Sequence, residues 1–287
     1  WNRRKLGSLW MLVAGLFFAI MGVLVKVGAY KFSSAELVFY RSFFGLMAII
    51  VLARIRQWPL ATPILGKQMS RGILGFISLL LFFYAIAALP LATAVTLNYT
   101  SPLFMAMLTP FFLHERPRKL LVGAIVLGFI GVTLLLKPSL HADELIAGTL
   151  GLLSGVLAGV VYLNLIQLGR AGEPDWRTVF YFTLVCTIGG GLWMLLHHFS
   201  PLAWQDLPLL LGVGLSATIA QLAMTRAYRT GDPLVVGSLA YSTVVLASLF
   251  GIVLWGETLS ADRWLAVLLI IISGIISIRA APQKLGA

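Results

Sequence analysis

Residues 6–28 decide the class of fold. They read LGSLWMLVAGLFFAIMGVLVKVG and follow directly after Arg3, Arg4 and Lys5. About 20 apolar residues are enough to cross the hydrocarbon core of a bilayer as one helix. Across all 287 residues, 60% are hydrophobic and only 11% are charged, whereas soluble domains carry about 25% charged residues. The composition therefore predicts an integral membrane protein and excludes a soluble domain of this size.

Similar apolar runs recur along the whole chain, separated by charges, Gly or Pro. The connecting segments are short, so successive helices are expected to be antiparallel neighbours. The sequence thus predicts an all-α integral membrane protein with ten transmembrane helices. The predicted spans are residues 6–28, 34–54, 70–88, 92–113, 118–136, 147–169, 176–197, 207–229, 233–255 and 261–279.

The distribution of positive charge predicts the orientation. The formal net charge is +11. With the predicted spans, 16 of the 21 Lys and Arg residues, Arg71 among them, fall on the side that holds both termini. Four fall on the other side, and Arg41 lies inside a span. By the positive-inside rule both termini are predicted to be cytoplasmic, and the chain is expected to be a multi-pass membrane protein. Anionic lipid explains the basic charge better than nucleic acid does.

An internal repeat divides the chain into residues 1–140 and 141–287. An offset of about 141 residues lays Tyr99-Thr100-Ser101 on Tyr241-Ser242-Thr243. Each half holds five predicted spans, and because five is odd, the second half starts on the opposite membrane face. The sequence therefore predicts two inverted five-helix repeats, an architecture typical of secondary transporters that work by alternating access.

Two short motifs carry a resemblance to a known family. Glu115 follows the fourth span within His114-Glu115-Arg116-Pro117, and Glu257 follows the ninth within Trp255-Gly256-Glu257-Thr258-Leu259. Glycines are spaced along the span after each motif. With the helix number and the repeat, this pattern resembles the drug/metabolite transporter superfamily in its ten-helix EamA type, and within it the bacterial aromatic amino-acid exporter branch. The first motif departs from the pattern, because His114 stands where the second half has Gly256.

Both motif glutamates precede the first turn of a predicted helix, where a carboxylate meets the positive end of the helix dipole. A structural cap is the favoured interpretation of Glu115 and Glu257, and a gating or coupling role is the alternative. Pro102 directly follows a polar cluster in the fourth span, where it removes one backbone hydrogen bond and frees a carbonyl. Broken helices at matching places in two repeats point to a transporter binding site.

Polar residues inside the spans are the candidates for substrate binding, because such groups must face protein or water rather than lipid. Hydrogen bonds between helices are the alternative role for each of them. Phe18 and Met21 in the first span could also line a cavity, although packing is the simpler interpretation. The candidate substrate-binding residues are Asn98, Tyr99, Ser101, Tyr162, Asn164, Gln221, Tyr241 and Ser242, together with Arg41.

Arg41 is the basic residue placed within a span. An ionisable residue inside a membrane is a functional candidate, and a guanidinium suits a substrate carboxylate. The alternatives are extension to the outer interface or pairing with Glu36. All ten acidic residues fall at span ends or in loops, which disfavours proton-coupled export of cationic drugs and favours a neutral, zwitterionic or partly aromatic solute.

Small glycine-rich surfaces predict close helix contacts. Gly151, Gly155 and Gly159 are spaced by four residues and form one flat stripe on a helix. Gly15 occupies the repeat position that corresponds to Gly155.

The predicted function is export of small metabolites, with aromatic or apolar amino acids as the specific substrate class. Export of another metabolite or of a drug is the alternative within the superfamily. A membrane-embedded enzyme is the rival from another class, but the four His residues are scattered and form no metal-binding pattern. The sequence predicts no catalytic residue, cofactor, metal or protein partner.

Overall fold

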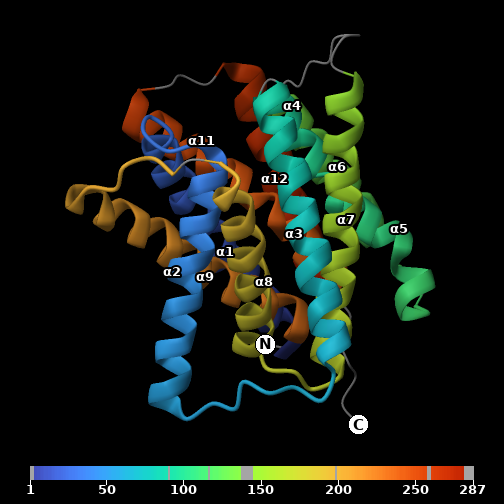
Figure 1. The fold of residues 1–287 in the computed structure, drawn as a ribbon. Helices are drawn as coiled ribbons and strands as arrows, with labels where there is room; N and C mark the ends of the chain where they lie inside the picture. Colours follow the sequence, from blue (N-terminus) through green and yellow to red (C-terminus); the bar gives the residue numbers. More distant parts are fainter. Residues whose placement is uncertain are drawn as a thin grey trace.

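The computed structural model describes residues 3–89, 91–115, 117–136, 145–197, 199–256 and 260–280, and in these ranges it contains helices and no strand. Glu257 lies outside the described residues. Figure 1 shows long helices bundled side by side, with α9 strongly inclined to α2 and α8. The helices are α1 (Arg3–Gly28), α2 (Ser34–Arg56), α3 (Leu65–Ala88), α4 (Leu91–Asn98), α5 (Ser101–Leu113), α6 (Lys119–Leu136), α7 (Leu145–Arg170), α8 (Asp175–Leu195), α9 (Leu207–Thr230), α10 (Pro233–Ala240), α11 (Ser242–Trp255) and α12 (Ala261–Ala280).

Nine segments within the described residues are long and apolar enough to cross a membrane. The predicted fourth span, residues 92–113, is not among them because it consists of two shorter helices, α4 and α5, separated at Tyr99 and Thr100. The predicted ninth span is interrupted only at Tyr241, between α10 and α11, and it is still among the nine, as Pro233–Leu254. The all-helical membrane class is confirmed, while the number of ten spans stays a prediction.

Local sequence signals set the helix ends. Ser33 and Glu36 form a capping box at the start of α2, with the Ser33 amide donating to Glu36 Oε2 over 2.7 Å. Asp232 caps α10, its Oδ1 accepting from the amides of Leu234 and Val235, and Pro233 occupies the first helical position. These caps satisfy amides that have no partner within the helix.

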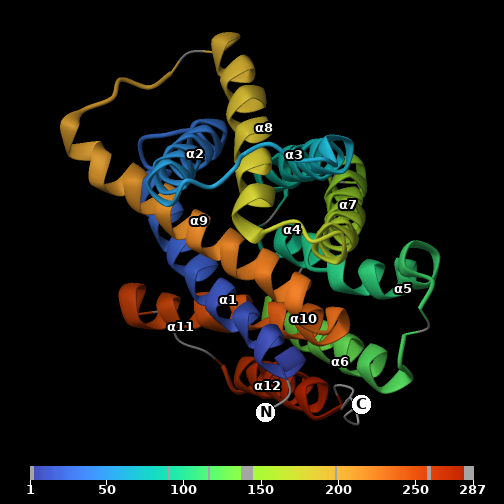
Figure 2. The same cartoon turned by 90° about the horizontal axis from the view of Figure 1, so that it is seen from below.

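Helices from the two halves of the chain pack against each other. α1 lies along α9, and α7 lies along α3. α2 packs on α8, and α6 packs on α12 at one side of the bundle, as Figure 2 shows. The bundle is therefore held together by contacts between the halves rather than by two separate cores.

The glycine stripe of α7 faces the break between α4 and α5. A Cβ at Gly155 would lie 2.6 Å from the carbonyl oxygen of Leu97, and a Cβ at Gly159 would lie 3.0 Å from that of Ser101. On α1, a Cβ at Gly15 would lie 2.8 Å from Ser242 Oγ, beside the other break. Each break thus sits on a glycine of the other half, and the predicted close approach at the glycine stripe is confirmed.

Both described ends of the chain lie at the same end of the bundle, the lower end in Figure 1, where Arg229 packs on Gly169 and Arg170 pairs with Glu115 between them. Arg118 Nη1 donates to the Ala280 carbonyl over 3.0 Å, and the Asp232 amide donates to Ser8 Oγ over 3.0 Å. We call this end the basic face, because Arg54, Arg56 and Arg170 also lie in the last turns of helices that end there. The other end is the opposite face.

We expect Gly155→Leu to lower stability by about 1–3 kcal/mol, because the side chain overpacks the contact with Leu97. Gly123→Leu is the matched control, since a Cβ at Gly123 would meet no atom within 4 Å. Thermal unfolding of both variants in detergent micelles measures the difference. Equal midpoints would contradict the packing of α7 on the break.

Candidate functional site

A cavity of about 350 Å³ lies inside the bundle, at the level of the two helix breaks. Its wall comes from both halves of the chain: α1 to α5 and α7 to α11 contribute residues, whereas α6 and α12 do not. Most of the lining is apolar. The polar side chains in the wall are Arg41, Arg71, Ser78, Asn98, Tyr99, Ser101, Tyr162, Gln221 and Thr243.

The break between α4 and α5 forms one side of the cavity. Thr100 Oγ1 donates to the Leu97 carbonyl over 2.5 Å, which satisfies part of the interrupted backbone. Asn98 Nδ2 donates to Ser154 Oγ over 3.2 Å and so fastens the break to α7. Pro102, at the start of α5, lines the cavity as well. The break therefore exposes backbone and polar side chains to the cavity while its own groups stay partnered.

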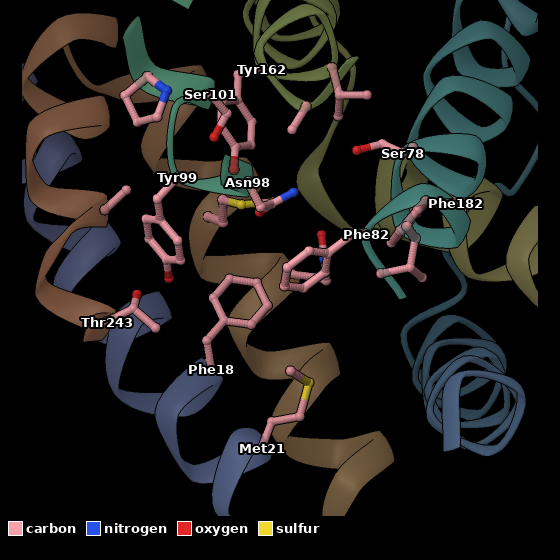
Figure 3. Close-up of a pocket in the computed structure, with 18 of the residues that line it drawn as sticks. Phe18, Met21, Ser78, Phe82, Asn98, Tyr99, Ser101, Tyr162, Phe182 and Thr243 are labelled. Atoms are coloured by element: carbon pink, nitrogen blue, oxygen red, sulfur yellow. The ribbon is translucent and has the colours of Figure 1, made fainter. Parts of the chain in front are cut away.

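Aromatic and sulfur-containing side chains supply most of the apolar surface. Figure 3 shows Phe18 and Met21 projecting from α1, with Phe82 and Phe182 on the side of α3 and α8. The Tyr99 hydroxyl points towards Thr243 in the same view. The Tyr162 ring stacks on Tyr228 with centroids 4.9 Å apart. Such a wall suits a solute with an apolar or aromatic body.

Two arginines give the cavity its charge. Arg71 is only 2% exposed, and its guanidinium lies 3.8 Å from the centroid of the Phe182 ring. Its Nη2 donates to Gln221 Oε1 over 3.4 Å, whereas its Nε and Nη1 have no hydrogen-bond partner. Arg41 lies in the wall of the same cavity, and none of the described lining residues is acidic.

Most of the residues predicted for the site lie in this wall. The structure brings together Arg41, Asn98, Tyr99, Ser101, Pro102, Tyr162 and Gln221. Whether each of them binds substrate stays a prediction.

Three predicted residues lie outside the wall. Tyr241 is 0% exposed, and its ring packs against Gly128 of α6, so that Thr243 lines the cavity in its place. Ser242 lies in a separate apolar groove between α1 and α12. Asn164 follows Tyr162 by two residues, which turns it by roughly 200° around the helix, away from the cavity. These three residues are therefore not part of the cavity wall, and a role for them in substrate binding stays a prediction.

Arg71 and several aromatic residues of the wall were not among the predicted site residues. Arg71 was placed among the basic residues at the cytoplasmic side, and this was wrong. Because α3 begins at Leu65 rather than near residue 70, Arg71 lies in the second turn of the helix and reaches the cavity. Phe18 and Met21 line the cavity, contrary to the simpler interpretation as packing residues. Phe82, Phe182 and Ser78 carried no distinguishing sequence signal.

Tight contacts close the bundle at the basic face. A Cβ at Gly169 of α7 would lie 2.9 Å from Arg229 Cα of α9, and Arg229 Nε pairs with Asp175 Oδ1 over 2.8 Å. In the C-terminal half of α1, by contrast, a Cβ at Gly22 in the cavity wall would meet no atom within 4 Å. The cavity thus has free space beside Gly22.

Glu173 joins three segments at the basic face. It accepts hydrogen bonds from Thr62 Oγ1 over 2.9 Å and Gln68 Nε2 over 2.8 Å, and it pairs with Arg177 over 3.1 Å. Its side chain is 3% exposed. Arg177 in turn donates to the Pro59 carbonyl. This network ties the connection between α2 and α3 to the start of α8.

Glu115, by contrast, lies at the surface. It pairs with Arg170 Nη2 over 2.9 Å, and its side chain is 59% exposed. It precedes the start of α6 by four residues, so its contact is an ion pair with α7 rather than the predicted helix cap.

We expect Glu173→Ala to destabilise the protein by about 3–5 kcal/mol, because it breaks a largely buried ion pair, removes the 2.8 Å acceptor of the buried Gln68 amide and leaves Arg177 only the Pro59 carbonyl. Glu115→Ala removes an exposed pair and should cost at most about 1 kcal/mol. Chemical or thermal unfolding in detergent compares the two. A loss in Glu115→Ala as large as that in Glu173→Ala would contradict the assignment.

The fold and the cavity together define a class: a multi-pass membrane protein that transports small molecules. The chain belongs to the EamA-like transporter family, which it matches over residues 5–137 and again over residues 145–279. The resemblance to this family is thereby confirmed, and family membership assigns the chain to transporters rather than enzymes.

Individual relatives span nearly the whole chain. It is 29% identical to the pseudopaline exporter CntI of Pseudomonas aeruginosa over 94% of this chain and 95% of that one. It is 28% identical to the riboflavin transporter of Rhizobium johnstonii, over 99% and 94%. One solved crystal structure superimposes with a TM-score of 0.85 at 20% identity, covering 98% of this chain and 100% of the other. That likeness shows the fold alone.

Proposed function

We propose that the protein is a carrier of the bacterial inner membrane that exports small amphipathic metabolites carrying a carboxylate. Amino acids with aromatic or apolar side chains are the simplest members of this class. The observation that carries the proposal is the cavity itself, whose aromatic and apolar wall also holds two guanidinium groups and residues of both helix breaks.

Alternating access is the mechanism we propose. Support comes from the two breaks at corresponding positions of the halves, which is where transporters of this kind place their substrate. The family match to each half and the packing of α1 on α9 and of α7 on α3 agree with two inverted repeats of residues 1–140 and 141–287. The closed basic face and the free space beside Gly22 fit one of the two states that such a carrier alternates between.

The chemistry of the wall supports the substrate class. A guanidinium binds a carboxylate through two parallel hydrogen bonds. The rings of Phe18, Phe82 and Tyr99 offer stacking surface to an apolar side chain. The relatives are named for pseudopaline and riboflavin, two different molecules, so the relationship alone does not select a substrate.

The rival functions lack support in the described part of the chain. A metal-dependent enzyme would need a cluster of ligands, and no group of three or more His, Cys, Asp or Glu side chains lies together among the described residues. An exporter of cationic drugs would need a carboxylate in the cavity, and the described lining has two arginines instead.

Proteoliposomes loaded with unlabelled phenylalanine should accumulate labelled phenylalanine by saturable counterflow, because a carrier exchanges its substrate across the membrane. Alanine and threonine should compete, and a nucleotide sugar should not. Empty liposomes are the control. Folded protein that gives no uptake above this control would contradict the amino-acid substrate.

We expect Ala158→Trp to abolish counterflow without loss of folding, because Ala158 lines the cavity and the indole would fill it. Leu153→Trp is the matched control on the same helix, where the side chain is exposed at the bundle surface. Counterflow and thermal unfolding are measured for both variants. Wild-type transport by Ala158→Trp would place the substrate path elsewhere.

A further inference from the structure

We propose that the cavity selects substrates with two carboxylates, one held by Arg41 and the other by Arg71. The inference rests on the proposed carrier function and narrows its substrate class. It predicts that an amphipathic dianion binds more tightly than an amino acid with one carboxylate and one ammonium group.

Arg71 supplies the first observation. Its side chain is almost fully buried, and the single hydrogen bond to Gln221 is long, at 3.4 Å. Two of its three guanidinium nitrogens, Nε and Nη1, are buried without a partner. The Phe182 ring covers one face of the guanidinium and fixes its plane. The guanidinium is thus held in place while its Nε and Nη1 donors are unused.

Arg41 supplies the second observation. It reaches the same cavity from α2, and the described residues give its side chain no hydrogen bond or ion pair. The alternative role as a partner of Glu36 is excluded, because that carboxylate accepts instead from the amide of Ser33 and from the amide and hydroxyl of Ser200. Arg41 is therefore a second uncommitted guanidinium in this wall.

Charge balance connects the two observations. Taking two cations out of water costs several kcal/mol each unless anions compensate them. The described lining offers no Asp or Glu, and the two guanidiniums act on each other electrostatically. A ligand with one carboxylate would leave one of the two charges uncompensated, whereas a dicarboxylate neutralises both.

The rest of the wall restricts the shape of such a ligand. The rest of the lining is mostly apolar and includes Phe18, Met21 and Phe82. A cavity of about 350 Å³ falls within the range of small-molecule sites. The occupant that fits is a compact molecule with two carboxylates and an apolar or aromatic group.

A series of ligands with one phenyl ring and different charges tests this inference. The series is phenethylamine, phenylalanine, 3-phenylpropanoate and phenylsuccinate, with phenyl phosphate added to separate carboxylate from phosphate recognition. Binding to the purified full chain in detergent is measured by calorimetry. We expect affinity to rise from the cation to the dicarboxylate. Equal affinities, or tighter binding of phenyl phosphate than of phenylsuccinate, would overturn the proposal.

Substitution of each arginine tests whether that arginine contributes to dicarboxylate binding. Arg41→Gln and Arg71→Gln should each weaken phenylsuccinate binding about tenfold or more, since each removes a charge-assisted contact. Neither should weaken phenethylamine binding. Arg226→Gln is the matched control, because Arg226 lies over Trp10 outside the cavity. Unchanged phenylsuccinate affinity in a folded Arg71→Gln protein would refute the pairing, and if that variant does not fold, the wild-type ligand series decides.

Counterflow of labelled phenylsuccinate separates this inference from the carrier function. Saturable flux of phenylalanine with no preference for phenylsuccinate leaves the carrier standing and overturns the dicarboxylate site. Tight, arginine-dependent binding of phenylsuccinate with no flux of any ligand supports the site and contradicts the carrier.

Discussion

Every backbone amide and carbonyl in an apolar solvent must find its partner within the protein, and the architecture of this chain follows from that constraint. Unbroken helices satisfy it over most of the length. The helix is interrupted at Tyr99 and Thr100. There the Thr100 hydroxyl donates to the Leu97 carbonyl, the Asn98 side-chain amide donates to Ser154, and Gly155 packs closely against the break. Part of the polar surface of the cavity therefore comes from the break between α4 and α5, and the rest comes from side chains on unbroken helices, such as Arg71 and Gln221.

The helical fold was predictable because the length and composition of an apolar run are set directly by the bilayer. Most helix ends agree with the predicted spans within a few residues. The largest difference, at the start of α3, lies in the sequence Leu65-Gly66-Lys67-Gln68, whose polar residues resemble a loop. Gln68 is buried there because Glu173 accepts its hydrogen bond. A distant residue thus decides where the helix begins, and no local pattern contains that information.

The site was predictable where one helix break carried several polar residues together, as Asn98, Tyr99 and Ser101 do. It was not predictable where the direction of a side chain decides whether the residue lines the cavity. Tyr99 and Tyr241 occupy equivalent sequence positions, yet one lines the cavity and the other fills the space beside α6. Arg71 follows Arg54 and Lys67 in the sequence. Because those charges indicate the membrane face, Arg71 was predicted to lie at that face as well. The asymmetry between the halves comes from packing, which a comparison of the two sequences does not reveal.

The exchange of glycines between the halves bears on how the chain is made. The break between α4 and α5 rests on Gly155, and the break between α10 and α11 rests on Gly15. During synthesis α1 to α6 are translated before α7. The break between α4 and α5 therefore exists before Gly155, which packs against it, has been translated. Gly15, which packs against the break between α10 and α11, has already been translated when that break is made. The two breaks are therefore translated in a different order relative to the glycines that pack against them, the first break before its glycine and the second after it.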